Sequence, residues 1–551
     1  MAGTAVVHLM LCLGGCSLYT RDYYEDYRQP PQQLRELTAV RLEEMARSQP
    51  VSVAQAEAAA DNGTALIAEP PEALEITLAE VRAAALANNL DLKVELVNPS
   101  LAEETVNEER ARFEAVLFGS VGHSVTDRPA TVVGGQAAQS QSASYDVGVR
   151  IPLRTGGTFT VDLPVTRFDD RTPGTEAAGG QSGVIDPSYD AGLQFSISQP
   201  LLRNAGVRAN THAIRVARYE RDIADARTKL AAIRILANAD RAYWLLYAVR
   251  RELEVRQQQY ELAVRQLQDA EKRVAAGDAP EIEIMRAQSG VAARLEAIII
   301  ADTEVRRAQR ILKRIMNRAD LSLSSRTALL PTTDPNPLGL DLDPEALAEY
   351  GLTSRMEMLE LELQLAIDAS TVDLERNATL PLFVVDYEYR VNGFAGSWNG
   401  ALRDVGGQAY ADHALTLRAE IPLGNEAARS RLRQALLQRL QRLATREQRR
   451  LVIRQEVYDA VDALEQDWQR ILAARQEVRL AGRTYEAEKR QFEVGLRTST
   501  DVLEAAARLA DAQSREIQAL TAYEISQIDI AYATGTLIGR DRVIWEPVAV
   551  K

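Results

Sequence analysis

Acidic side chains stand beside two similar turns in this chain of 551 residues. The stretch "AEKRVAAGDAPEIEIMRA" occupies 270–287, and "AEKRQFEVGLRTSTDVLEA" occupies 487–505. Each passes from a charged, helix-favouring run through a glycine, Gly277 or Gly495, into a second helical run. Glycine supplies the backbone freedom that a helix end needs. The pattern therefore predicts two helical hairpins, each with carboxylates close to its tip.

The residues after these turns fit two different roles. Thr498 and Asp501 have the spacing of a capping box, in which both side chains bond to backbone N–H groups at a helix start. Asp278 and Pro280 are predicted to start the helix after the first turn in the same way. Asp501 and Glu504 also lie about one turn apart on one helix. Several copies of the chain around one axis would turn them into rings of carboxylates that favour cations.

Enzyme chemistry is not indicated. The four histidines, His8, His123, His212 and His413, are far apart in the chain. No Ser–His–acid order, paired-cysteine metal site or glycine-rich phosphate loop stands beside a predicted strand. We therefore expect no catalysis, no cofactor and no metal. The net charge of −14 argues against a nucleic-acid partner, because such proteins need a basic surface.

The N-terminus has the pattern of an export signal. The stretch "AVVHLMLCLGGC", 5–16, is too short to span a bilayer and is typical of the apolar part of a secretory signal. Its end resembles a bacterial lipoprotein signal, in which Cys16 becomes the lipidated first residue. An ordinary apolar N-terminus is the alternative, because no Lys or Arg precedes Cys16. A start codon upstream of Met1 would account for the missing basic residues.

Composition divides the rest of the chain into segments. After the signal, 1–16, a polar and proline-containing stretch at 17–75 is predicted to be a tether with one short helix around 33–47. Two similar helix–strand–helix repeats are predicted at 76–330 and 331–540. A short C-terminal tail, 541–551, follows.

Apolar and polar residues alternate strictly in several segments. This period of two predicts strands with one apolar face and one polar face. The segments are 144–153, 157–165, 192–202, 382–391 and 414–423, and 115–125 is expected to form a further strand.

Very long helices are predicted in both halves. After Gly206 about 70 residues run to Ala276 without Gly or Pro, which as one helix would extend for about 105 Å. A return helix follows at 280–316. The second half repeats this with a helix that ends at Gly495 and a return helix at 499–536. Helices of this length belong to a coiled coil, a stalk or a tube.

Shorter helix–turn–helix segments precede the strands in both halves, at 76–115 and 343–378. The strand exits "SQPLL" at 198–202 and "EIPLG" at 420–424 also correspond. With "GLRTSTDVLEA" at 495–505, this arrangement resembles the TolC-type outer-membrane efflux and secretion channels over roughly 76–540.

The resemblance implies a mainly α, α+β fold. It implies a trimer with a long periplasmic helical tube and one shared transmembrane β-barrel. It also implies a lipid-anchored protein in the outer membrane of a Gram-negative bacterium. The trimer would be the exit duct of a tripartite efflux pump or a type I secretion system, with a periplasmic adaptor and an inner-membrane pump of RND or ABC type. The strands support oligomerisation independently, because four to six strands cannot close a pore of useful size.

The resemblance also assigns roles to residues at the tips. Asp501 and Glu504 match acids that line the closed aperture, although the family usually has Asp where this chain has Glu504. Glu283 and Arg497 match an acid and an arginine that hold the tips together as a gate latch. The alternatives are that Asp501 only caps its helix and that Arg497 is a solvated surface arginine.

The first half contains more strands than the family needs. The hairpin 144–166, which turns at 154–157, is additional. It either projects beyond the barrel or adds strands to it, and we expect a projecting hairpin. The alternative to a channel is a lipid-anchored coiled-coil protein of the envelope without a pore, which would not need two-faced strands.

Overall fold

The computed structural model of the protein describes most of the residues that follow residue 72. It describes 53, 55, 73–128, 138–171, 187–277, 280–408, 410–494 and 496–540. Contacts divide the chain into two units, Met1–Pro71 and Glu72–Lys551, and the elements below all belong to the second unit. The predicted signal with Cys16, the helix at 33–47 and the tail 541–551 lie outside the described residues.

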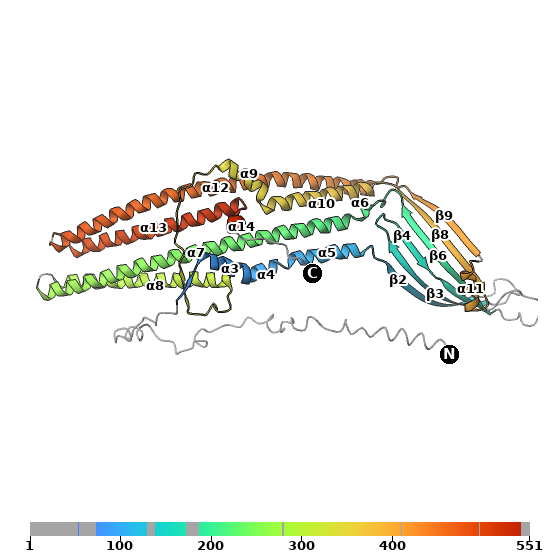
Figure 1. Cartoon of the computed structure of the whole chain (residues 1–551), viewed down its shortest axis with the longest axis horizontal. Coiled ribbons are helices and arrows are strands. Elements are labelled where there is room, and N and C mark those ends of the chain that lie inside the picture. The colour runs from blue at the N-terminus through green and yellow to red at the C-terminus, as the bar shows by residue number, and fades with distance from the viewer. Residues whose placement is uncertain are drawn as a thin grey trace, which may run out of the picture. The chain divides into compact units, whose positions relative to one another are not determined.

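Two helical hairpins form the longest part of this unit (Figure 1). Helices α7 (His212–Ala275) and α12 (Glu426–Glu493) have 64 and 68 residues. At 1.5 Å per residue they are about 96 and 102 Å long, which confirms the predicted length. Each returns through a helix of 35 residues, α8 (Ile282–Met316) or α13 (Ser499–Ala533), and α13 also packs against α7.

Shorter helices flank the long ones in both halves. The first half has α3 (Leu78–Asn88), α4 (Leu90–Glu95) and α5 (Asn98–Ala111), and the second has α9 (Pro344–Ser354) and α10 (Met356–Ala378). α6 (Val207–Asn210) and α14 (Leu537–Arg540) are single turns. Helices α5 and α10 both pack along α7, and α10 also packs along α12. The predicted helix–turn–helix segments are therefore confirmed, and in the structure they pack along the long helices.

One antiparallel sheet continues from these helices. Its strands are β2 (Val116–Arg128), β3 (Ala138–Pro152), β4 (Thr158–Asp162), β5 (Val165–Arg171), β6 (Ser188–Pro200), β8 (Leu382–Ala395) and β9 (Tyr410–Glu420). The order is β2-β3-β4-β6-β8-β9. Strand β5 follows β4 in the same position of the sheet, between β3 and β6. Both halves of the chain thus contribute to one sheet.

The predicted projecting hairpin at 144–166 is wrong. Its two arms are β3 and the β4–β5 stretch, and both lie inside the sheet. β3 pairs with β2 on one side and with β4 and β5 on the other, while β4 and β5 also pair with β6. Backbone N–H and C=O groups of an inserted strand are satisfied on both sides in this position, which a hairpin projecting alone does not achieve.

The largest core forms where the two long hairpins meet the short strands. There β1 (Ala73–Ile76) pairs in parallel with β7 (Ala328–Pro331). Tyr243, Leu246, Leu312 and Met316 are almost fully buried beside them. Neither strand was predicted, because each is only four residues long and its partner is distant in sequence.

A bidentate ion pair ties α3 to α7 next to this core. Arg82 donates from Nε and Nη2 to the two carboxylate oxygens of Asp240, each at 2.8 Å. The Asp240 side chain has no exposed surface. A buried carboxylate is tolerated in such a place because its charge and its hydrogen bonds are both satisfied.

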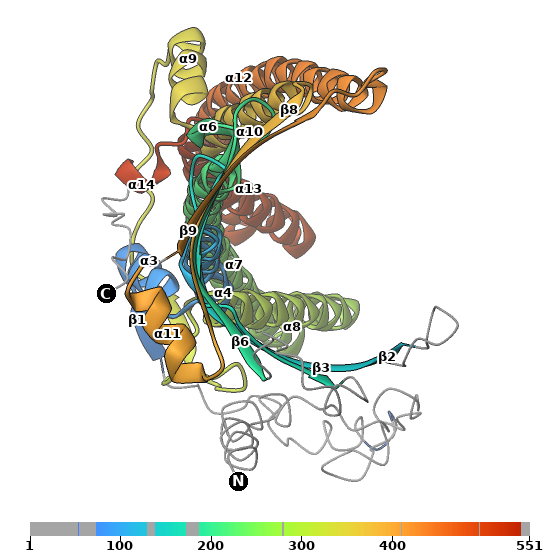
Figure 2. The same ribbon diagram turned by 90° about the vertical axis from the view of Figure 1, so that its right-hand side faces the viewer.

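A short amphipathic helix, α11 (Trp398–Gly406), connects β8 to β9. It packs against β8 and β6, on the convex side of the curved sheet in Figure 2. Ala401 and Val405 are buried against Val165, Ala191 and Val391. This helix was not predicted.

Candidate functional site: helical tips and a two-faced sheet

The first tip is a sharp helix end. α7 ends at Ala275, and Gly277 has a φ of +80°, in the left-handed region that favours glycine. The Gly277 N–H donates to the Val274 carbonyl at 3.0 Å. α8 begins at Ile282, and its N-cap residue, Glu281, makes no capping side-chain bond to the described residues. The predicted helix-starting residue Asp278 lies outside the described part of the chain.

The second tip is a capped turn. The Leu496 N–H donates to the Gln491 carbonyl at 2.9 Å, the long hydrogen bond of a Schellman helix end. Gly495, between them in the turn, lies outside the described residues. Thr498 then begins α13 with a capping box: Thr498 N–H donates to Asp501 Oδ2 at 2.9 Å, and Asp501 N–H to Thr498 Oγ1 at 3.4 Å.

These contacts control the charge of Asp501. The Thr498 backbone N–H, then its hydroxyl, then the Arg497 charge lower the pKa of the Asp501 carboxyl. Asp501 is therefore an ionised helix cap. Glu504, one turn further, pairs with Arg508 at 3.3 Å on the same helix, and both side chains are exposed. The buried face of α13 here is formed by Val502, Ala505 and Ala506.

The predicted latch residues do not meet within the described protomer. Glu283 Oε1 lies 2.8 Å from Arg286 Nη1, on its own helix. Arg497 Nε lies 3.1 Å from Glu488 Oε2 and donates to Gln491 Oε1 at 3.0 Å. Each of the two residues therefore has a partner in its own hairpin.

A different contact joins the two hairpins near their tips. The Arg273 guanidinium lies over the Phe492 ring, 4.1 Å from its centroid. Arg273 is in the last turn of α7 and Phe492 in the last turn of α12. Sequence reasoning missed this pair because nothing in the spacing of the two residues couples them. One sequence signal could have suggested the pair: Arg273 lies four residues before Gly277, and Phe492 lies three residues before Gly495.

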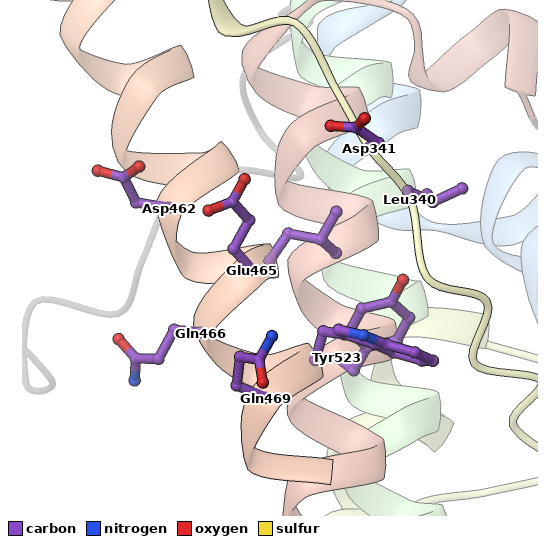
Figure 3. A pocket seen from close by; sticks show the side chains of 9 residues that line it. Leu340, Asp341, Asp462, Glu465, Gln466, Gln469 and Tyr523 are labelled. Carbon is purple, nitrogen blue, oxygen red and sulfur yellow. The ribbon is translucent and has the colours of Figure 1, made fainter. Parts of the chain in front are cut away.

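An open cavity of about 450 Å³ lies farther along the second hairpin (Figure 3). Asp462 and Glu465 of α12, Asp341 of the segment before α9, and Tyr523 of α13 line it. Tyr523 donates from its hydroxyl to the Leu338 carbonyl, which holds that segment against the helices. Within the described residues no group of three or more His, Cys, Asp or Glu side chains is arranged to hold a metal ion.

The sheet has one apolar face and one polar face across all its strands. One row of paired residues is Leu117, Val149, Val161, Phe195, Tyr389 and His413. The next row, on the opposite face, is Phe118, Gly148, Asp162, Gln194, Arg390 and Asp412.

The apolar face of this sheet is exposed in the protomer. Leu117 and Leu415 are 74% and 75% exposed. Such a face is typical of strands that have lipid on one side and water on the other. Among the described helices, none combines the length and the apolar composition needed to cross a bilayer.

Part of the chain matches a known family. Residues 349–536, which include the second tip, match the family described as "Outer membrane efflux protein". No curated protein matches the chain in sequence.

Solved channels share the fold of the chain. The outer-membrane channel CmeC of Campylobacter jejuni is 15% identical, with a TM-score of 0.61 over 84% of this chain and 86% of that one. The outer membrane protein VceC of Vibrio cholerae is 14% identical, with a TM-score of 0.58 over 83% and 96%. The channel MtrE of Neisseria gonorrhoeae is 16% identical, with a TM-score of 0.57 over 84% and 89%.

These similarities agree with the geometry of the chain. Transport channels of this kind are not enzymes, as the sequence led us to expect. The resemblance to the TolC-type channels is confirmed: the chain has the fold of the outer-membrane efflux channels, and its second half carries an outer membrane efflux protein domain.

Proposed function

We propose that three copies of this chain form an exit duct in the outer membrane of a Gram-negative bacterium. The observation that carries the proposal is that one chain joins a two-faced sheet to helical hairpins about 100 Å long. The sheet supplies part of a membrane wall, and the helices supply part of a conduit across the periplasm. Substrate passes from a periplasmic adaptor and an inner-membrane pump, of RND or ABC type, through this duct to the outside.

Closure requires several copies. One curved sheet leaves the backbone groups of its two edge strands without partners, and no water is available in a bilayer to satisfy them. The edges of neighbouring copies therefore pair with one another. The organisation into two repeats, 76–330 and 331–540, gives each copy two helical hairpins, so that a trimer presents six tips around one opening.

The tips are the gate and the docking site for the adaptor. The Arg273–Phe492 contact holds the two tips of one protomer together. Glu283 and Arg497 act as a latch between neighbouring copies, exchanging the partners they have within their own hairpins. Cation–π contacts and exposed ion pairs are individually weak, so a docking partner can release them.

The acids beyond the second tip form the aperture. Three copies of Asp501 and Glu504 place two rings of carboxylates at the narrow end. The hydrogen bonds from Thr498 lower the pKa of the Asp501 carboxyl and so favour its charged form. The aperture therefore favours cations.

The aperture proposal is tested by measuring ion selectivity in planar bilayers. Asp501→Asn combined with Glu504→Gln should reduce the cation preference and weaken block by divalent cations. Glu486→Gln, which also removes a carboxylate near the tip but lies on α12 and pairs with Arg490 on its own helix, is the matched control. An unchanged reversal potential in the double variant would mean that Asp501 serves only as a helix cap.

The latch is tested by exchanging charges. Arg497→Glu should raise the conductance, because it places like charges opposite each other. Adding Glu283→Arg should restore part of the closure, because the pair is rebuilt with its signs exchanged. A single variant that conducts like the wild type would leave Arg497 as a surface arginine.

Cys16 adds a lipid anchor to this arrangement. Its acyl chains contribute membrane affinity, which the barrel already provides. Cys16→Ser with an intact export signal should therefore still insert. A variant that stays in the periplasm would contradict the barrel.

A further inference from the structure

The additional hairpin at 144–166 belongs to a continuous wall of strands. β4 and β5 occupy one strand position between β3 and β6. The ladder continues across the two residues between them: Leu163 N–H donates to the Val147 carbonyl at 2.8 Å, and Gly192 N–H donates to the Pro164 carbonyl at 2.9 Å. The described sheet therefore has six strand positions per chain: β2, β3, β4–β5, β6, β8 and β9.

The inserted strands have the same two faces as their neighbours. Val149 pairs with Val161 and Val161 with Phe195 on the apolar face. Val147, on that face of β3, is 51% exposed. On a hairpin that projected into water, an apolar face in register with the rest of the sheet would be exposed to solvent. A strand in contact with lipid requires such a face.

Strand lengths agree with a place in the membrane. β2, β3, β6, β8 and β9 have 13, 15, 13, 14 and 11 residues. A tilted strand needs about 9–11 residues to cross a bilayer. The inserted position runs from Thr158 to Arg171 and is of similar length.

Aromatic side chains mark the end of the sheet that lies away from the long helices. Trp398 of α11 packs edge-to-face on Tyr145 of β3 and Tyr189 of β6, with ring centroids 5.8 and 6.4 Å apart. Aromatic girdles are typical of the membrane–water interface of barrels. The inserted strand β3 thus contributes to the same girdle as β6.

The two edges of the sheet are complementary. Among the described strands, β2 and β9 each have one neighbour. β2 follows α5 and leaves the helices, whereas β9 returns to α12. The β9 edge of one copy and the β2 edge of the next are therefore antiparallel, like every other pair in the sheet. All eleven residues of β9 are exposed in the protomer.

We propose that three copies close a barrel of eighteen strands, in which the inserted hairpin supplies two of the six strands from each chain. This rests on the trimer proposed above. Barrel diameter grows roughly linearly with strand number, so the insertion widens the barrel by about half compared with four strands per chain. Barrels of about 16–18 strands leave an aqueous channel. The lumen therefore admits bulky, hydrated solutes, and selection by size occurs at the tips.

Lipid-phase quenching tests the position of the hairpin. Single cysteines are introduced into the full-length chain, with Cys12 and Cys16 replaced by Ser, and are labelled with a fluorophore. Brominated lipids should quench labels at Val149 and Val161 but not at Arg150 and Thr160. Phe195 and Ser196 of β6 provide the same comparison on a strand that the insertion does not include.

The outcomes separate this inference from the proposed function. Quenching at 195 without quenching at 149 and 161 would leave the barrel intact and overturn the place of the hairpin in its wall. Absence of quenching at all three positions, in protein recovered from membranes, would overturn the barrel itself and the inference with it.

Strand number is measured directly on the unaltered protein. Electron cryomicroscopy of the wild-type trimer in nanodiscs should show eighteen strands. A closed barrel that excludes 138–171 would overturn the inference. Deletion of 129–171 leaves β2 joined to β6 through 172–186. The largest polyethylene glycol that enters this variant from outside should have a radius about a third smaller than in the wild type. An unchanged polymer cut-off in a folded, trimeric deletion variant would also overturn it.

Discussion

At the residue scale, the contact between Arg273 and Phe492 joins the two helical tips of one protomer. A cation–π contact at a partly exposed site contributes about 0.5–1 kcal/mol. Arg273→Ala or Phe492→Ala should therefore shift the equilibrium toward the open tube by about 2- to 5-fold. The measurement is the open probability in planar bilayers.

Lys272→Ala is the matched control for this prediction. Lys272 is adjacent in sequence and pairs with Asp269 on its own helix. It should leave the open probability unchanged. The double variant Arg273→Ala with Phe492→Ala should be no more open than either single variant, because the contact is lost once. Additive effects would mean that the two residues act separately.

His212 gives the fold a pH dependence. Its Nδ1 lies 2.9 Å from Ser370 Oγ. Burial, and then the neighbouring Arg215 charge, lower the pKa of His212 below its ordinary value of 6.5, despite the opposing effects of Ser370 and Glu375. The folded state thus binds this proton less tightly than the unfolded state. The stabilisation is complete above pH 6.5 and decreases as the pH falls toward the folded pKa.

The check is the unfolding temperature of the detergent-solubilised protein at pH 7.5 and 5.5. His212→Gln retains a hydrogen-bonding side chain but does not titrate. It should show a smaller decrease between the two pH values than the wild type does. Equal decreases in both proteins would assign the pH dependence to other groups.

The buried pair of Arg82 and Asp240 is a third residue-scale case. Arg82→Met removes the guanidinium and leaves a carboxylate without exposed surface inside the protein. Breaking a buried pair from one side costs about 3–5 kcal/mol. The double variant Arg82→Met with Asp240→Leu should recover much of this loss. The midpoint of denaturant unfolding measures both effects.

At the element scale, α11 depends on a close approach to β8. A Cβ added at Gly393 would lie 2.0 Å from the Ala401 carbonyl oxygen. Gly393→Ala should therefore displace α11 and speed hydrogen exchange in 398–406. Gly406→Ala is the control, because a Cβ at Gly406 meets nothing within 4 Å. Hydrogen exchange in 398–406 that is as slow in Gly393→Ala as in the wild type would mean that α11 keeps its packing against the sheet.

The sequence allowed some elements to be predicted and not others, for physical reasons. The helix α7 follows from a long run without Gly or Pro, and α12 follows from a run interrupted only by Gly482. The strands β6 and β8 follow from strict alternation, and all of these signals are local. The parallel pair β1–β7 joins distant segments of four residues each, and α11 is held by tertiary packing against the sheet. Local patterns contain neither kind of information.

The same limit explains the hairpin and the tips. Alternation located both arms of 144–166, but their place between β2 and β6 depends on pairing partners that the alternation does not specify. At the tips, the capping box of Thr498 and Asp501 was predictable because its bonds are local. The contact of Arg273 with Phe492 joins two helices that meet only in the folded chain.

At the scale of the whole molecule, the helices and the sheet have complementary roles. In the proposed trimer the long hairpins carry the duct away from the membrane, and the two edges of each sheet pair with the edges of neighbouring copies. The closed assembly removes both the exposed edges and the unpaired backbone groups. Membrane insertion, oligomerisation and pore formation should therefore occur together.

Single-channel recording of the purified full-length protein in planar bilayers shows whether this chain forms a gated channel. The wild type should give small, cation-preferring currents that increase in the Arg273→Ala and Arg497→Glu variants, because both loosen the tips. Trimeric, membrane-inserted protein that passes no current, in the wild type and in both of these variants, would mean that the chain does not form a channel.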